Sequence, residues 1–123
     1  MNAAPSLPVA EEFKSIYGKQ LGVQMMKFAR NVQFSIKAGK DAEFAQLLQS
    51  EVIPVLKKQP GFKSELALMR GSNAIGISVW DDRKSAEQYA QVSYPQVLQK
   101  LSPVIEGTPQ VEMYEVAAST LAS

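Results

Sequence analysis

The segment Gly61–Asp82, with the sequence GFKSELALMRGSNAIGISVWDD, decides the fold. Two runs rich in apolar residues, Phe62–Arg70 and Ala74–Trp80, have the length and composition of strands. Between them lies Gly71-Ser72-Asn73, which has the residues of a tight turn. Because so short a connection joins antiparallel neighbours, the segment predicts a β-hairpin. Asp81-Asp82 then offers a helix N-cap directly after the second strand.

A strand and a helix are expected before this hairpin. Apolar and polar residues alternate over Met26–Lys37, as in a half-buried strand, with Arg30 on the otherwise apolar parity. A helix should run over Asp41–Lys58, because apolar residues recur there at three- and four-residue steps. Asp41 suits its first turn by capping or by its interaction with the helix dipole. Pro54 should kink this helix or end its first part, since proline lacks the N–H that the helix needs.

A second helical region and a last strand are expected after the hairpin. The helix that begins after Asp82 should break at Pro95, and Ser93 can cap the segment that follows. Gly107-Thr108-Pro109 should end this region, because it has the residues that break helices. Gln110–Ala118 is then expected to be the fourth strand.

This order of elements predicts an α+β, ferredoxin-like βαββαβ fold, with a four-stranded antiparallel sheet and the helices on one face. The other face of the sheet should carry a semi-polar set of side chains that depends on the register: Ala29, Asn31, Gln33, Ser35, Gly76, Ser78 and Trp80. Trp80, with Met69 and Met113 or Tyr114, argues against full exposure of this face. We therefore expect it to pack on the sheet of a second copy, as a homodimer with two-fold symmetry.

The length of 123 residues corresponds to a single domain. We expect the domain over residues 25–118, an N-terminal extension over 1–24 that is partly helical or disordered, and a tail over 119–123. Within the extension, Val9–Gly18 has helical spacing. The net charge is +1 and the basic residues are scattered, so a nucleic-acid partner is not expected. No apolar run has the length of a membrane span or of a signal peptide, so we expect a cytoplasmic protein.

The sequence contains neither cysteine nor histidine. The absence of cysteine excludes disulfides, thiol nucleophiles and iron–sulfur clusters. The absence of histidine removes the commonest base near neutral pH and the usual ligand of zinc, copper and haem iron. Any chemistry must therefore use carboxylates, Lys, Tyr, Ser or no protein acid–base group.

Four segments resemble motifs of one known family. They are VLKKQPGF at Val55–Phe62, SVWDD at Ser78–Asp82, LSPVIEGTP at Leu101–Pro109 and MYEV at Met113–Val116. Together they resemble the antibiotic-biosynthesis-monooxygenase-like (ABM) family of the dimeric α/β-barrel superfamily, over about residues 25–116. The resemblance implies that two ferredoxin-like sheets pair as a dimeric α/β barrel.

One branch of this family oxidises polyphenols or quinols with O₂, without a metal, a flavin or another prosthetic group. Because this chemistry needs neither histidine nor cysteine, the resemblance implies a cofactor-independent monooxygenase acting on a small aromatic or quinol-type substrate, with no cofactor and no metal. Arg30 would stabilise the substrate's phenolate, and Tyr89 or Tyr94 would orient a hydroxyl. The expected catalytic residues are Trp80, Arg30 and Tyr89, and the expected substrate-binding residues are Phe28, Phe34, Phe44 and Tyr94.

Other interpretations of the same residues stay open. The phenylalanines and Trp80 could equally fill the core. Tyr89 could be a helix residue with its hydroxyl at the rim, and Arg30 could form an ion pair at an interface. The third strand lacks the Asn that well-known monooxygenases of the family use, and without histidine the haem-degrading branch is rejected. The alternatives are a non-catalytic dimeric protein that binds a small ligand or has an accessory role, and a purely structural dimer.

Overall fold

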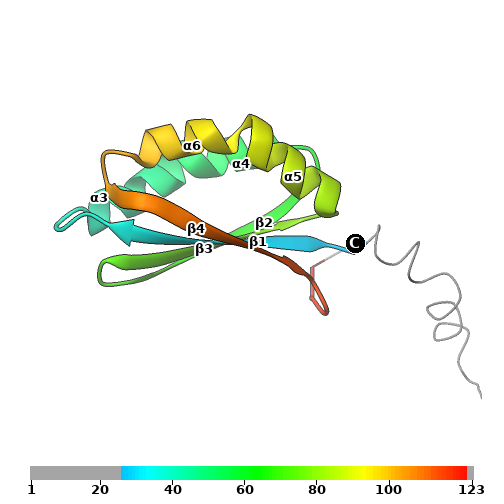
Figure 1. Ribbon diagram of the computed structural model, residues 1–123. Helices are drawn as coiled ribbons and strands as arrows, with labels where there is room; N and C mark the ends of the chain where they lie inside the picture. The colour runs from blue at the N-terminus through cyan, green and yellow to red at the C-terminus, as the bar shows by residue number, and fades with distance from the viewer. Residues whose placement is uncertain (1–25, 122–123) are drawn as a thin grey trace, which may run out of the picture.

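The computed structural model describes residues 26–121, which form one sheet covered on one side by helices (Figure 1). The elements are β1 (Phe28–Ile36), α3 (Asp41–Leu47), the π-helical segment η2 (Leu48–Val52), α4 (Ile53–Lys57), β2 (Phe62–Arg70), β3 (Asn73–Trp80), α5 (Arg83–Val92), α6 (Tyr94–Leu101) and β4 (Ile105–Glu115). The four strands are antiparallel in the order β2-β3-β1-β4. This confirms the α+β, ferredoxin-like fold. The helix expected over Val9–Gly18 lies outside the described residues, and the domain limits stay a prediction.

The helix between β1 and β2 runs past Pro54, where a kink or an end was expected. The turn before this proline is the π-helical segment η2, and α4 continues the helix to Lys57. A π-helical turn is wider than an α-helical one, so it accommodates the missing N–H. The wider turn also keeps residues at four-residue steps on one face, and these are the buried side chains Phe44, Leu48, Val52 and Leu56. Asp41 makes no capping hydrogen bond and acts only as an acidic residue in the first turn.

The second helical region breaks where the sequence predicts. Asp82 caps α5 by accepting a hydrogen bond from the backbone N–H of Ser85 over 2.8 Å. Pro95 lies in the first turn of α6, where a missing N–H costs nothing. Ser93 precedes α6 but makes no side-chain cap; its hydroxyl donates to Gln59 Oε1 at 3.0 Å instead. No helix within residues 26–121 is long and apolar enough to cross a membrane.

The last strand begins at Ile105, earlier than the expected start at Gln110. Gly107-Thr108-Pro109 does not end the preceding region but lies within β4, opposite a register shift between Gln33 and Ser35 of β1. The segment is therefore a bulge, and Gly107 has the positive φ of 68° that bulges often need. Pro109 is tolerated because β4 is an edge strand.

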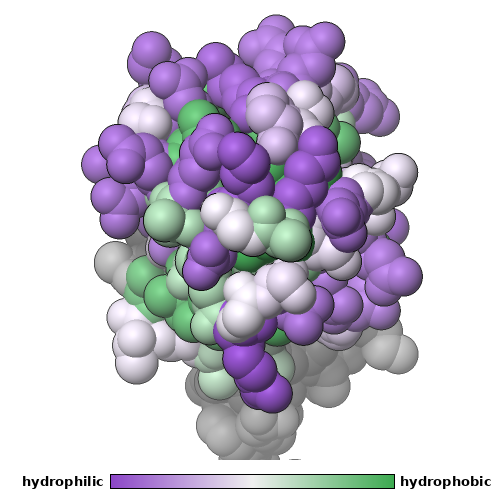
Figure 2. Space-filling model, turned by 90° about the vertical axis from the view of Figure 1, so that its left-hand side faces the viewer, coloured by the Kyte–Doolittle hydropathy of each residue, from purple (hydrophilic) through white to green (hydrophobic). Residues whose placement is uncertain are grey.

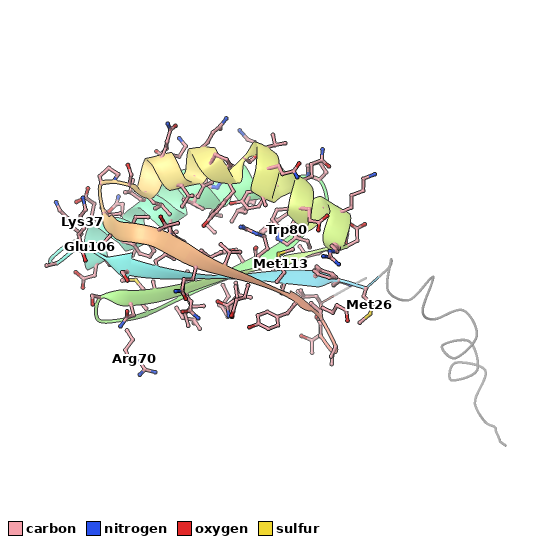
Figure 3. The ribbon with its side chains drawn as sticks, viewed as in Figure 1. Met26, Lys37, Arg70, Trp80, Glu106 and Met113 are labelled. Atoms are coloured by element: carbon pink, nitrogen blue, oxygen red, sulfur yellow. The ribbon has the colours of Figure 1, made fainter. Side chains whose placement is uncertain are left out.

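The register corrects the expected composition of the outer sheet face. Arg30 lies opposite Ser78 and Val32 opposite Gly76, and direct partners in antiparallel strands share a face. Gly76, Ser78 and Trp80 therefore face the helices, and the outer face carries Ile75, Ile77 and Val79 in their place. The expected set depended on the register, and the pairing of β1 with β3 places these three residues of the third strand on the inner face. Trp80 is fully buried between the two layers, whereas Arg70 extends from the other side of the sheet (Figure 3).

The open end of the β2–β3 hairpin, at Gly61 and Asp81, lies against α5. The backbone N–H of Asp81 donates to the carbonyl of Gly61 over 2.7 Å. The rings of Phe62 and Trp80 meet edge to face, with centroids 5.5 Å apart. Gly61 has a positive φ of 80°, and a Cβ there would come within 2.6 Å of the Cβ of Ser85 on α5. The helix therefore packs directly on the backbone at the start of β2.

Gly61→Ala should destabilise the fold more than Gly39→Ala. Both glycines have positive φ, but a Cβ on Gly39 would meet no atom within 4 Å. Gly39→Ala should therefore cost only the conformational strain, about 1–2 kcal/mol. Gly61→Ala should add an overpacking cost of about 1–3 kcal/mol, because α5 has to shift. Denaturant unfolding of the two variants measures the difference, and equal losses of stability would show that α5 does not press on Gly61.

Candidate functional site

A narrow cavity lies between the sheet and the helices. It contains about 450 Å³ of atom-free space, part of it continuous with solvent, of which about 30 Å³ can be reached by the centre of a water molecule. Its walls are mostly apolar and buried, and Ala67 is the one exposed residue among those that line it. Because Ala67 lies on the edge strand β2, the cavity reaches the surface at that edge of the sheet.

Arg30 is the charged centre of the cavity. Its side chain projects from the inner face of β1 and is only 3% exposed. The guanidinium lies over the rings of Tyr94 and Tyr89, with its carbon 4.3 Å and 5.2 Å from the two centroids. Its Nε is buried without a hydrogen-bond partner. Cation–π contacts of this kind offset part of the cost of burying the charge but do not replace a counterion.

Two tyrosines bring hydroxyl groups to the same cavity. Tyr89 comes from α5 and Tyr94 from α6, and both side chains line the cavity. The hydroxyl of Tyr94 is buried and has no hydrogen-bond partner. Burial raises the pKa of both tyrosines, and the charge of Arg30 opposes this only in part. Both therefore remain neutral hydrogen-bonding groups at physiological pH.

Glu65 contributes an acid from the inner face of β2. A Cβ on Gly76 would lie 3.1 Å from its Oε2, so the carboxyl group lies over the backbone of β3 at Gly76. Burial raises the pKa of Glu65 from 4.5 to about 8, and the nearby charge of Arg30 lowers it in part. At neutral pH most of this carboxyl group is therefore protonated.

The structure brings most of the expected site residues to the cavity. Arg30, Tyr89, Tyr94, Phe34 and Phe44 line it, whereas Phe28 and Trp80 do not.

Trp80 lies behind the cavity wall, where it stacks on Tyr89 with ring centroids 4.8 Å apart. Its Nε1–H donates to Ser78 Oγ over 2.9 Å. Trp80 therefore positions Tyr89 and Ser78 and has no surface open to a ligand in the cavity.

Sequence reasoning missed Glu65 and Ser78, which also line the cavity. Counting the hairpin register from its two-residue loop gives the partner of Glu65, although not the side of the sheet that the helices cover. Arg70 pairs with Asn73, so Glu65 falls opposite Ser78 and shares its face. Within the described residues, no group of three or more His, Cys, Asp or Glu side chains could hold a metal ion.

Known structures share this fold. No protein-family model matches the sequence, and the comparison with curated proteins finds no match. The crystal structure of NE2512 from Nitrosomonas europaea, a protein of unknown function, is 22% identical with a TM-score of 0.70 and covers 81% of this chain and 98% of its own. SnoaB, a cofactor-independent oxygenase from Streptomyces nogalater, is 17% identical with a TM-score of 0.64, covering 77% and 97%.

A monooxygenase from the gene ActVA-Orf6 of Streptomyces coelicolor, solved with the ligand nanaomycin D, is 18% identical with a TM-score of 0.64, covering 80% and 95%. Because these sequence identities are low, the similarity shows only that the chains share a fold. The chain therefore has the fold of antibiotic biosynthesis monooxygenases, which agrees with the resemblance of its motifs.

The ionisation of buried Glu65 should make the fold less stable at alkaline pH than at acidic pH. Because the pKa of this acid is about 8 in the folded protein and near 4.5 when unfolded, the folded state binds its proton more tightly. Its contribution to stability is therefore lost as pH rises from about 4.5 to about 8. Glu65→Gln should remove this loss, so that at about pH 9 the variant melts at least about 4 °C above the wild type, which corresponds to about 1 kcal/mol.

The matched control for this prediction is Glu87→Gln, because Glu87 is an exposed carboxylate on α5. Its melting temperature should follow that of the wild type at every pH. If the melting temperatures of Glu65→Gln and the wild type change with pH in the same way, Glu65 is already ionised at neutral pH.

Proposed function

We propose that the cavity binds a small phenol or quinol as its anion and that the protein is a cofactor-independent monooxygenase. The observation that carries this proposal is the buried, unpaired guanidinium of Arg30, set between aromatic rings in an apolar cavity. A phenolate supplies both the missing negative charge and a flat ring that suits such walls. The fold shared with a cofactor-independent oxygenase and a monooxygenase supports the same conclusion.

The proposed reaction needs no protein-bound redox group. The phenol loses its proton to the solvent, from which the peroxide formed below takes one back. The loss makes the ring electron-rich, and Arg30 stabilises the anion. A ring carbon of the phenolate then forms a bond to one atom of O₂, which gives a peroxide. Cleavage of the O–O bond with loss of the ring hydrogen leaves one oxygen atom on the ring as the carbonyl of a quinone, and the other leaves as water. The substrate supplies the electrons, so atoms and charge balance without a further reductant.

The cavity is narrow for such a ligand. Ligand pockets are typically about 300–1,000 Å³, whereas the water-accessible part here is about 30 Å³. Binding therefore requires a wall to open, and the exposed edge at Ala67 is the place where a ring can enter. A non-catalytic ligand-binding role would use the same cavity and the same entrance. Binding without oxygen consumption would support that alternative.

The proposal includes a homodimer that forms through the outer sheet face. The cytoplasmic location stays a prediction. Figure 2 shows hydrophilic side chains over most of the helical layer and hydrophobic ones reaching the surface at the level of the sheet. On the outer face Leu66, Leu68 and Tyr114 are 58%, 47% and 50% exposed. A second copy would cover these apolar side chains.

Oxygen consumption in metal-free buffer tests the proposed reaction. The protein should consume O₂ with at least one member of a panel of quinols and hydroxylated aromatics. Arg30→Met should lower this activity by at least about 100-fold, because one charge-assisted contact in a dry site contributes about 3 kcal/mol. Ala67→Trp should lower it by closing the entrance without disturbing the core.

Arg83→Gln is the matched control, because Arg83 is an exposed arginine on α5 that pairs with Glu87. It should keep full activity, and all variants should keep cooperative melting. If no aromatic compound in the panel is consumed, the monooxygenase proposal is wrong; if Arg30→Met keeps full activity, the assigned site is wrong.

The dimer proposal predicts different effects for two exposed apolar residues. Leu66→Asp places a charge on the outer sheet face and should convert the dimer to a monomer. Val92 is 63% exposed on α5, on the helical side of the molecule, so Val92→Asp should leave the dimer intact. Light scattering after size-exclusion chromatography measures both masses. A monomeric wild-type protein at micromolar concentration would contradict this part of the proposal.

A further inference from the structure

Arg30 and Glu65 face the same cavity without forming an ion pair. They come from β1 and β2, which flank β3 in the sheet, and both side chains line the cavity. Among residues 26–121, no carboxylate oxygen lies within 4.0 Å of a guanidinium nitrogen of Arg30. The guanidinium stacks on tyrosine rings instead. The cavity therefore has one uncompensated positive charge whenever Glu65 holds its proton.

The surroundings of Glu65 favour its protonated form. The titratable or charged groups that face it are Arg30 from β1, Tyr89 from α5 and Tyr94 from α6. The helical segments α3, η2 and α4 contribute only apolar side chains to the cavity: Phe44, Leu48, Val52 and Leu56. Without a direct ion pair or a water-filled surrounding, the carboxylate form lacks stabilisation, which agrees with the raised pKa of about 8.

We propose that Glu65, in its protonated form, donates a hydrogen bond to the same bound anion that Arg30 neutralises, so that the cavity selects monoanionic ligands over neutral ones. This inference rests on the proposed function only in that the cavity binds a ligand; it needs no reaction with oxygen. A neutral carboxylic acid adds a donor without adding negative charge. One monoanion then balances the charge of Arg30 and meets the unpartnered donors, Arg30 Nε–H and the hydroxyl of Tyr94.

Ionisation of Glu65 should reverse this selectivity. A carboxylate at the same position cannot donate a hydrogen bond and repels a bound anion. The ligand binds the protonated form of the site, so its affinity falls as pH rises through the ionisation of Glu65. Tyr89 and Tyr94 do not contribute to this fall, because burial moves their ionisation to still higher pH.

Benzoate and benzamide test this proposal, because they have similar shapes and differ in charge. Benzoate is ionised at every pH above about 6, so its own titration does not interfere. Calorimetric titration of the full chain should show benzoate binding at least about tenfold more tightly than benzamide at about pH 6. Above about pH 8 the benzoate affinity should fall, with a slope approaching about tenfold per pH unit. The benzamide affinity should change little.

Glu65→Gln and Glu87→Gln distinguish the role of Glu65 from a general effect of pH. The glutamine amide keeps an N–H donor at position 65 but cannot ionise. Glu65→Gln should therefore show no alkaline fall in its benzoate affinity, whereas Glu87→Gln should show both the wild-type affinity at about pH 6 and the wild-type fall.

Several outcomes would overturn the proposal: no benzoate binding at any pH, equal binding of benzamide, a pH-independent affinity of the wild type, or an alkaline fall that persists in Glu65→Gln. Oxygen uptake decides the proposed function separately. A protein that consumes oxygen with quinols but shows one of these outcomes keeps its proposed function and loses this role of Glu65. A protein with the expected benzoate profile and no oxygen uptake is an anion-binding protein.

Discussion

The pairing of β1 with β3 is the constraint on which the cavity depends. With Phe28 opposite Trp80, Arg30 lies opposite Ser78 and both face the helices. A shift of one residue in β1 would move Arg30 to the outer face and bring Asn31 inside, because side chains alternate along a strand. The turn after Arg70 and the contact of Gly61 with α5 hold the two ends of the β2–β3 hairpin, and β3 then presents a fixed edge to β1.

The buried charge of Arg30 is expensive for the folded state. Removing a guanidinium from water costs several kcal/mol without a counterion, and each cation–π contact returns only about 0.5–2 kcal/mol. A leucine or methionine at this position would fill the same space between Tyr89 and Tyr94 at lower cost. Nothing in the packing of the described core requires a charge there. The arginine is therefore better explained by an anion that it meets than by its contribution to stability.

The fold could be predicted from the sequence because its signals are local. The turn at Gly71 and Ser72, the cap at Asp82 and the alternation in β1 each act within a few residues. Glu65 could not be placed by the same reasoning, since the more apolar parity of β2, with Leu66 and Leu68, faces outward. Hydrophobic alternation predicts which parity is more apolar, but not which side the helices cover. The bulge that contains Pro109 and the π-helical turn before Pro54 arise from tertiary packing, which overrides local breaking signals.

The apolar outer parity of β2 links the cavity to the proposed dimer. Side chains alternate along β2: Glu65 and Ala67 face the cavity, whereas Leu66 and Leu68 lie on the opposite face. β2 is an edge strand that pairs only with β3, so no strand supports its other side. A partner sheet packed on Leu66 and Leu68 would hold this strand in place, and a ring entering at Ala67 would have to displace it. Because side chains alternate along one backbone, the proposed dimer and the proposed ligand would contact the same strand from opposite faces.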